Sequence, residues 1–388
     1  MNFNCHLNKI LNCIILPVSE RIKILIIFIT LIFCLSSSTI KAQVLTDTAS
    51  LDLIKRGVDY IYNFQFDKAE NVCNTISQSY TGHPITNLLR GMITFWKNYP
   101  LIPSSPAHVS FEKDMRRGIE LSEKKHNPAY EAEYLLTDLC ARGLLLNYYA
   151  NNNLNAEIIP LAKETYQDIR RAFYFTGVYS DFYFFTGLYN YYREAYPEAH
   201  RLYRTLAFLF PKGNKEKGCK DLQIAANNSI FLKAESSSVL SWINLSFENN
   251  YREAFNYSKS LQELYPTNPE YLGEYIKNLL LVKEYEKAES LIISSVNDIN
   301  NPYYQAQLSI FNGILQEKKY HDNEKAQQYY NKGIRDISIF GEYGNEFAAY
   351  AYFGLSRTSV DKSDKHNKRI YRKKANELAV SKRVNFDD

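Results

Sequence analysis

The chain has 388 residues, of which 45% are hydrophobic and 23% are charged, and its formal net charge is +4. Four basic residues and one acidic residue give the first 42 positions a charge of +3, so the rest of the chain carries +1. This balance does not support a globally basic protein, and we expect no nucleic-acid partner. A chain of this length normally suggests two or more globular domains, but no Pro-, Gly- or Ser-rich linker divides it.

Residues 1–42 are predicted to be an export signal peptide. Arg21 and Lys23 precede an apolar run from Ile24 to Leu35, and small polar residues and Lys41-Ala42-Gln43 follow. The run is too short to span a bilayer as a stable helix and fits the core of a signal peptide. We expect cleavage after Ala42 and a location in the periplasm or cell envelope, with an uncleaved N-terminal anchor as the alternative.

A four-residue phrase recurs at a fixed interval later in the chain. Tyr251-Arg252-Glu253-Ala254 returns as Tyr285-Glu286-Lys287-Ala288 after 34 residues. This interval is typical of a helix–turn–helix solenoid repeat, in which a small residue lies where the second helix crosses the first. Because one such unit cannot bury its apolar face alone, we expect the units to stack on one another.

Asn-Pro pairs mark two predicted helix starts. Asn268 is expected to be an N-cap, with Pro269 at the first helical position, where its missing N–H costs nothing. Asn301-Pro302 repeats this signal 33 residues later. Looser copies of the repeat are expected at Gly57 to Ala69, at Tyr320 to Ala326 and at Gly354 to Ala375.

These patterns predict an all-α protein, a right-handed α-solenoid of tetratricopeptide-like helix–turn–helix repeats with five to seven helix pairs. Residues 43–50 are expected to be a short disordered lead-in, and residues 51–388 a single solenoid. The repeats are expected to be degenerate over residues 51–218 and clearer over residues 219–388. No apolar run after the leader reaches membrane-spanning length, so we expect no transmembrane span in the mature chain.

Residues that could carry catalysis are scattered. No nucleophile elbow, P-loop, His-Glu-x-x-His or Cys-x-x-Cys motif occurs. The mature cysteines Cys73, Cys140 and Cys219 are far apart and fit no metal spacing. Cys73 and Cys140 are expected to be small buried hydrophobes, and one disulfide among the three stays open. We therefore expect a non-enzymatic protein with no cofactor and no metal.

Residues 173–196 are rich in aromatic side chains. Asp181, Tyr183, Asn190 and Tyr191 lie off the main aromatic stripe and are the candidate partner-binding residues of a groove, because a tyrosine hydroxyl seeks water or a partner. The remaining rings fall near helical spacing and are expected to fill the core between helices. This stripe comprises Phe173, Phe175, Tyr179, Phe182, Phe185, Tyr189 and Tyr192.

A helical scaffold without catalytic motifs favours binding of a protein or peptide partner in the concave groove built from the first helices. The aromatic stretch leaves an alternative, a glycan- or nutrient-binding envelope protein, since tyrosine rings also stack on sugars. Six basic residues between Lys365 and Lys374 are expected to form a solvated helix face, with peripheral contact to an anionic envelope surface as the alternative.

Four stretches between residues 181 and 269 carry a family resemblance, namely Phe184 to Tyr192, Phe210 to Gly218, Tyr251 to Ala254 and Tyr265 to Pro269. On these stretches the chain resembles a group of exported bacterial tetratricopeptide repeat proteins. The order of the elements is also similar, at a distance, to the tetratricopeptide repeat protein 39 family. This resemblance implies an all-helical scaffold and no activity for particular residues.

The Ala-Gln end of the leader and the abundant Asn, Tyr, Ile and Lys resemble exported proteins of the Bacteroidota.

Overall fold

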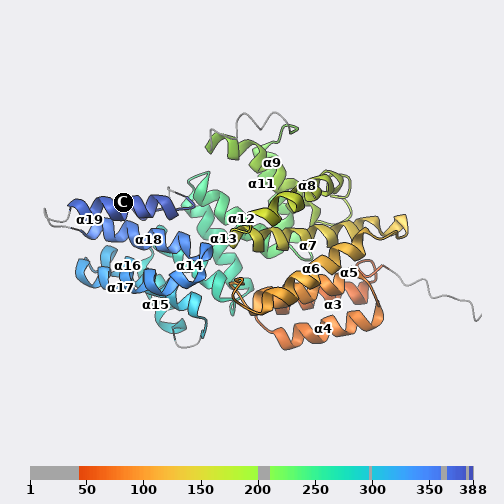
Figure 1. The fold of residues 1–388 in the computed structure, drawn as a ribbon, viewed down its shortest axis with the longest axis horizontal. Helices are drawn as coiled ribbons and strands as arrows, with labels where there is room; N and C mark the ends of the chain where they lie inside the picture. The colour runs from red at the N-terminus through yellow and green to blue at the C-terminus, as the bar shows by residue number, and fades with distance from the viewer. Residues whose placement is uncertain (1–42, 200–209, 297–298, 360–364, 382–383, 388) are drawn as a thin grey trace, which may run out of the picture. The chain divides into compact units, whose positions relative to one another are not determined.

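The computed structural model describes residues 43–199, 210–296, 299–359, 365–381 and 384–387 (Figure 1). Residues from Thr48 onward form one compact unit, and the preceding residues belong to another. The described residues form sixteen α-helices and no β-strand, so the predicted all-α class is confirmed. The predicted signal peptide lies outside the described residues. Helix α3 begins at Thr48, inside the segment expected to be a lead-in.

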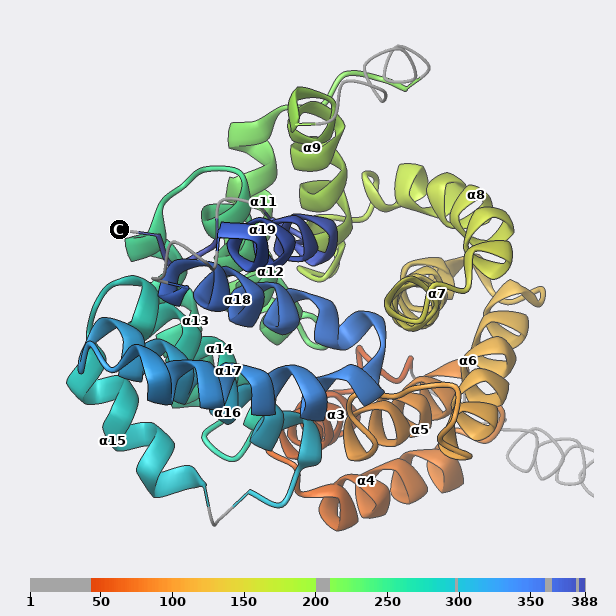
Figure 2. The same ribbon diagram turned by 60° about the vertical axis from the view of Figure 1, so that its left-hand side comes forward.

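The sixteen helices form eight consecutive pairs. The predicted range was five to seven pairs, so the structure has one pair more than the upper limit and three more than the lower limit. Each second helix packs on the first helix of the next pair, which makes the described chain an all-α solenoid (Figure 2). The extra pairs come from residues 84–228, where the sequence does not keep the repeat period. The pairs are α3 (Thr48–Tyr62) with α4 (Phe66–Ser79), α5 (Pro84–Lys97) with α6 (Ala107–Glu123), α7 (Glu131–Asn151) with α8 (Asn155–Ala172), α9 (Phe182–Ala199) with α11 (Lys215–Asn228), α12 (Lys233–Ser246) with α13 (Tyr251–Leu264), α14 (Pro269–Leu281) with α15 (Tyr285–Ser295), α16 (Pro302–Lys318) with α17 (Asn323–Ile337), and α18 (Glu342–Thr358) with α19 (Lys365–Leu378).

The repeat phrase has the structural role that its spacing predicts. Helices α13 and α15 begin at Tyr251 and Tyr285, the first residues of the two phrases. Ala254 and Ala288, three positions later, are fully buried. Ala326 is the fourth residue of α17 in the same way and is also fully buried, which confirms the looser copy at that position.

Both Asn-Pro pairs cap a helix and also hold distant parts of the chain together. The Asn268 side chain accepts hydrogen bonds from the first turn of α14, and Asn301 does the same for α16. In addition, Asn268 Nδ2 donates to the carbonyl of Tyr62, at the end of α3, at 3.0 Å. Asn301 Nδ2 donates to the carbonyl of Tyr99, just after α5, also at 3.0 Å. The starts of two late helices are therefore tied to the ends of two early ones.

An aromatic seam surrounds these ties. Tyr62 packs its ring on Tyr265 and Tyr271, with centroid distances of 5.2 and 6.2 Å. Tyr99 packs on Tyr303 and Tyr343, at 6.2 and 5.8 Å. Aromatic pairs in such edge-on and tilted arrangements stabilise a contact beyond the area that they bury. The tyrosine rings at the ends of α3 and α5 are therefore packed against rings from the later helices.

Helices α9 and α11 cross at a pair of glycines. A Cβ atom at Gly187 would lie 3.0 Å from the carbonyl oxygen of Gly218, and one at Gly218 would lie 2.6 Å from the backbone nitrogen of Tyr191. Only glycine allows the two backbones to approach this closely. The crossing brings the aromatic first turns of α9 against α11. Of the described helices, none is long and apolar enough to cross a membrane.

Candidate binding surfaces

Two of the four residues predicted to contact a partner hold the helical packing together. Asp181 is fully buried, and its carboxylate accepts hydrogen bonds from the backbone N–H groups of residues 230–232 at 2.8 to 3.1 Å. Asn190 is 6% exposed and donates from Nδ2 to Asp221 Oδ2 at 3.3 Å. Both side chains thus satisfy polar groups inside the fold, as buried polar groups must.

The two tyrosines differ in their exposure. Tyr191 is fully buried, and its hydroxyl donates to Glu248. Tyr183 is half-buried. All four residues were expected to be exposed on a groove. Of the four, only Tyr183 is partly exposed in the structure. Their role in partner binding stays a prediction.

The aromatic stretch also departs from the expected stripe. Helix α8 ends at Ala172 and α9 begins at Phe182, so residues 173–181 are not helical and a helical spacing does not apply to them. Phe182 and Phe185 are buried as expected, whereas Phe173, another member of the expected stripe, is 38% exposed. Sequence reasoning missed an outer aromatic cluster, in which rings from α8, α9 and the segment before α11 pack together at 5.2 to 6.1 Å. Its members are Tyr166, Phe173, Tyr189 and Phe210.

The clearest binding surface is one that the chain itself occupies. The tail, residues 384–387, buries alternate side chains: Val384 is fully buried and Phe386 is 7% exposed, while Asp387 is exposed. The segment is bent at Asn385, and Phe386 has a φ of +56°, so the alternation belongs to a short bent segment and not to an extended strand. The sequence reasoning did not single out this segment, although its alternation of apolar and polar residues was a usable signal.

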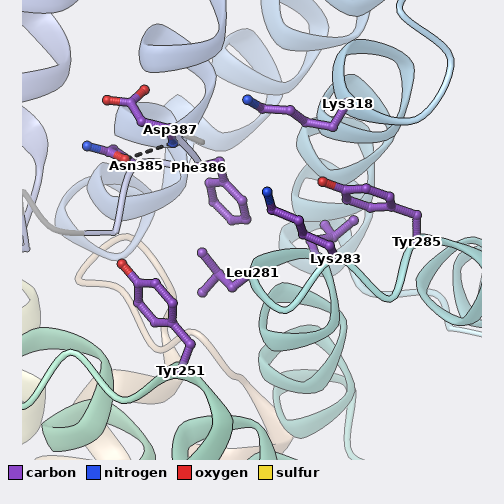
Figure 3. A pocket seen from close by; sticks show the side chains of 9 residues that line it. Tyr251, Leu281, Lys283, Tyr285, Lys318, Asn385, Phe386 and Asp387 are labelled. Carbon is purple, nitrogen blue, oxygen red and sulfur yellow. Dashed lines mark hydrogen bonds between the residues drawn. The ribbon is translucent and has the colours of Figure 1, made fainter.

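The surface under the tail, here called the tail seat, lies where first helices end and second helices begin. Phe386 packs on the Tyr350 ring of α18, with a centroid distance of 5.1 Å and nearly perpendicular planes. Beside Phe386 remains a small cavity of about 40 Å³ (Figure 3). Residues from the ends of α14 and α16 and the starts of α13 and α15 line it together with the tail, namely Tyr251, Leu280, Leu281, Lys283, Tyr285 and Lys318.

A charged clamp fixes the polar side of the tail. Arg357, near the end of α18, donates from one guanidinium nitrogen to the carbonyl of Asn385 at 2.5 Å and to Asp387 Oδ1 at 3.2 Å. Its other N–H groups donate to Glu317, which is 8% exposed. Arg372 of α19 donates to the second oxygen of Asp387 at 3.1 Å. The clamp thus binds both a backbone carbonyl and an acidic side chain of the tail.

Two interior carboxyl groups are paired with tyrosine hydroxyls. Burial raises the pKa of Glu235 and of Glu270 to about 7. Glu235 accepts a hydrogen bond from the Tyr62 hydroxyl, and Glu270 from that of Tyr99. Burial also raises the pKa of the Cys73 thiol to about 11, which makes it a poor nucleophile at neutral pH.

Cys73, Cys140 and Cys219 are unbridged, and the first two are buried as predicted. Within the described parts of the chain, no group of three or more His, Cys, Asp or Glu side chains could hold a metal ion. Cys73 and Cys140 therefore contribute to packing, and the three thiols give no candidate metal site.

Comparison with known proteins adds no argument to those from the structure. No protein-family model and no curated protein matches the chain. Among solved structures, the crystal structure of the yeast Tom70 is similar to this chain at 14% sequence identity, over 87% of this chain and 93% of that chain, with a TM-score of 0.26. A superposition this loose carries no argument about function, so the solenoid assignment rests on the eight helix pairs themselves.

Proposed function

We propose that this protein is an exported, non-enzymatic repeat scaffold that binds a short segment of a protein partner. The observation that carries the proposal is the tail seat, where a short segment of the chain already lies with two buried apolar side chains and a clamped acidic one. The face built by the first helices, where the sequence placed the partner, is partly covered by the aromatic seam. The partner segment is therefore placed along the tail seat.

The tail defines the chemistry of the segment that would bind. It needs an aliphatic residue, an aromatic residue two positions later and an acidic residue next, matching Val384, Phe386 and Asp387. Burying one such apolar side chain is worth roughly 1.5–3 kcal/mol. Because the tail is tethered, its effective concentration is on the order of millimolar, and a partner has to compete with it. A partner therefore binds only if its affinity and concentration together outweigh those of the tethered tail.

Affinity capture with three forms of the mature protein tests this proposal. One form ends at Asp388, a second ends at Ala379, so that it lacks the tail, and the third is this shortened form with Arg357→Gln. Crosslinked envelopes of the source organism are expected to yield a partner that the shortened form retains more strongly, and that the shortened form with Arg357→Gln loses. A partner retained equally by all three would place the binding surface elsewhere, and its contact sites could then be mapped by the crosslinks.

The outer aromatic cluster supports the alternative, a glycan-binding envelope protein. Its rings lie beside Tyr174, which is 85% exposed, and an exposed ring face is what stacks on a sugar. A glycan screen with the wild type and with Tyr174→Ala and Phe173→Ala tests it. Glycan binding that either substitution abolishes would support this function. If the wild type retains no glycan, the glycan-binding alternative is wrong and protein binding remains the one candidate function.

Export itself is open to a direct test. The proposal requires that the mature chain begin at Gln43 and reside in the periplasm or envelope. Mass spectrometry of the N-terminus from fractionated cells is expected to show Gln43 as the first residue. A chain that keeps Met1 and stays with the cytoplasmic fraction would contradict export without bearing on the tail seat.

A further inference from the structure

The last helix of the solenoid, α19, carries a strong excess of positive charge. Six basic residues and one acidic residue lie between Lys365 and Leu378, which gives this helix a formal charge of +5. Residues 43–388 together carry +1, so the part of that range outside α19 carries −4. Positive charge is therefore concentrated on one helix of a chain that is otherwise slightly acidic.

The opposite end of the solenoid shows that a terminal helix does not need this charge. A terminal repeat needs a polar outer face, because no further repeat covers it. Helix α3, the first of the described helices, meets this need with two basic and two acidic residues, all exposed and without net charge. The single sign of the charge on α19 therefore has another reason.

The basic residues also lie where they stabilise α19 least. The N-terminal end of a helix dipole favours acidic side chains, and the C-terminal end favours basic ones. Yet Lys365 and Lys368 belong to the first turn, which holds no acidic residue, and the last turn holds no basic residue. Lys365, Arg369 and Lys373 follow one another at intervals of four, so they share one face, on which like charges repel. An anion outside the helix would relieve this repulsion.

The apolar face of α19 is already packed on α18 (Figure 1). Ala375 is fully buried in a cluster with Ala349 and Phe353 of α18. The ring of Tyr371 stacks on that of Tyr352, with a centroid distance of 6.2 Å and an interplanar angle of 26°. Because this face is covered, α19 cannot insert it into a bilayer as a free amphipathic helix does. The face that is left for a partner is the basic one.

The basic face is open to solvent. Within the part of the chain that the structure describes, Lys365, Lys368 and Arg369 are exposed and form no ion pair. Lys373 is 80% exposed, and its Nζ lies 3.8 Å from Glu377 of the same helix. Exposed pairs of this kind contribute little to stability, so these cations are free to meet an external anion.

The neighbours of these cations favour a lipid surface as the partner. Ile370 is 38% exposed on α19, and Val380, just after the helix, is 64% exposed. The headgroup layer of a bilayer accepts basic and aliphatic side chains together. Single-stranded nucleic acids instead stack on aromatic side chains, and Tyr371, the tyrosine of α19, is stacked on α18. Four of the six basic residues are lysines, point charges that suit a diffuse layer of phosphates better than a fixed bidentate site.

We infer that α19 binds the anionic surface of a phospholipid bilayer through its basic face. The helix lies along the headgroups, with Lys365, Arg369 and Lys373 toward the lipid phosphates and the aliphatic side chains at the same level. Each basic residue near such a surface strengthens binding roughly fivefold. The inference does not depend on the tail seat, whose clamp uses Arg357 and Arg372.

Co-sedimentation of the mature protein, residues 43–388, with lipid vesicles tests the inference. One set of vesicles contains equal parts of phosphatidylglycerol and phosphatidylcholine, and the other contains phosphatidylcholine alone. We expect binding to the first set only, and we expect it to weaken at least tenfold when the salt is raised from about 0.05 to 0.5 M. Absence of binding to the anionic vesicles, or equal binding to both sets, would overturn the inference.

A triple variant and a matched control decide whether α19 makes the contact. Replacing Lys365, Arg369 and Lys373 together by Gln is expected to weaken binding to the anionic vesicles at least tenfold. The control removes the same charge from exposed positions of three other helices and is expected to change binding less than twofold. Its substitutions are Lys68→Gln in α4, Lys287→Gln in α15 and Lys325→Gln in α17. Equal losses in the two variants would show attraction by net charge alone and would overturn the inference.

A nucleic-acid probe separates lipid from other polyanions. A fluorescent DNA duplex is titrated into the same protein at about 0.15 M salt, because binding to DNA depends steeply on salt. We expect the duplex to bind more weakly than the anionic vesicles. A duplex that binds more tightly than the vesicles, and that the triple variant of α19 loses, would replace the lipid surface by nucleic acid as the partner.

Discussion

The tail seat and the pocket around Arg142, lined by residues between 122 and 171 from α6, α7 and α8, use charge in different ways. In the tail seat, Arg357 and Arg372 clamp an acidic side chain beside a buried ring. In the pocket, the buried Arg142 is paired with carboxylates of three helices, and further basic side chains share the lining. Neither surface belongs to the regular part of the repeat: one depends on the C-terminal tail and the other on the connection between α6 and α7. Repetition supplies the frame, and departures from it supply the candidate sites.

The largest effect on stability is expected at a buried charged cluster outside both sites. Lys277 is 1% exposed, and its Nζ lies 2.7 Å from Glu274 and 3.6 Å from Glu346. Lys277→Met leaves these carboxylates uncompensated and is expected to lower the free energy of unfolding by about 3–5 kcal/mol. Chemical denaturation measures it, with Arg335→Met as an exposed control expected to change less than about 0.5 kcal/mol. A loss below about 1 kcal/mol would mean that this cluster is hydrated like a surface pair.

The next effect is a pH dependence of stability. Burial raises the pKa of Glu235 and of Glu270 from 4.5 to about 7, so the folded chain holds protons that the unfolded chain releases. Stability is therefore expected to fall as the pH rises from about 4.5 to 7, by at most about 3 kcal/mol for each carboxyl. Glu270→Gln should flatten this slope in urea titrations at several pH values, and Glu263→Gln should not. A stability that rises across this window would contradict the pKa directions.

A smaller effect is expected for the tail. Phe386→Ala removes a buried ring from a chain end and is expected to cost the docked tail about 1.5–3 kcal/mol. Global unfolding should change little, because the tail can detach without opening the helix pairs. Hydrogen exchange should show faster exchange at residues 384–387 in this variant, with Phe173→Ala, an exposed ring, as the control. Unchanged exchange would show that the tail is held without its ring.

The smallest effect concerns ionic strength. Raising the salt from about 0.05 to 0.5 M shortens the screening length severalfold. Docking of the tail should weaken only slightly, because Phe386 and Val384 are buried. A large loss of protection at residues 384–387 in high salt, measured by hydrogen exchange, would show that the charged clamp and not the buried side chains holds the tail.

Local features of the fold could be predicted from the sequence. The recurrence of Tyr251 to Ala254 one period later located two second helices and the buried alanines at their crossings. Asn268 and Asn301 were identified as N-caps, since an Asn before Pro has a short-range reason to start a helix. These signals concern neighbours within one turn or one repeat, which the residue types decide on their own.

The candidate sites could not be predicted in the same way. The second hydrogen bond of Asn268 reaches Tyr62, 206 residues away, and the path to it depends on small rotations between many repeats. Asp181 was expected on a groove, yet its carboxylate caps backbone N–H groups 50 residues later. The non-helical residues 173–181 broke the assumed spacing and exposed Tyr174. Arg142 gave no signal, because its carboxylate partners come from three different helices.

The most direct test of the proposed function is the binding of the tail in trans. A fluorescent peptide of residues 380–388 is titrated into the mature chain that ends at Ala379, with fluorescence anisotropy as the measurement. We expect micromolar binding, at least tenfold weaker binding to the chain that ends at Asp388, and loss of binding for the Phe386→Ala peptide or for Arg357→Gln in the protein. A shortened chain that stays folded but binds neither peptide, or binds both equally, would contradict a docked tail and the binding surface proposed from it.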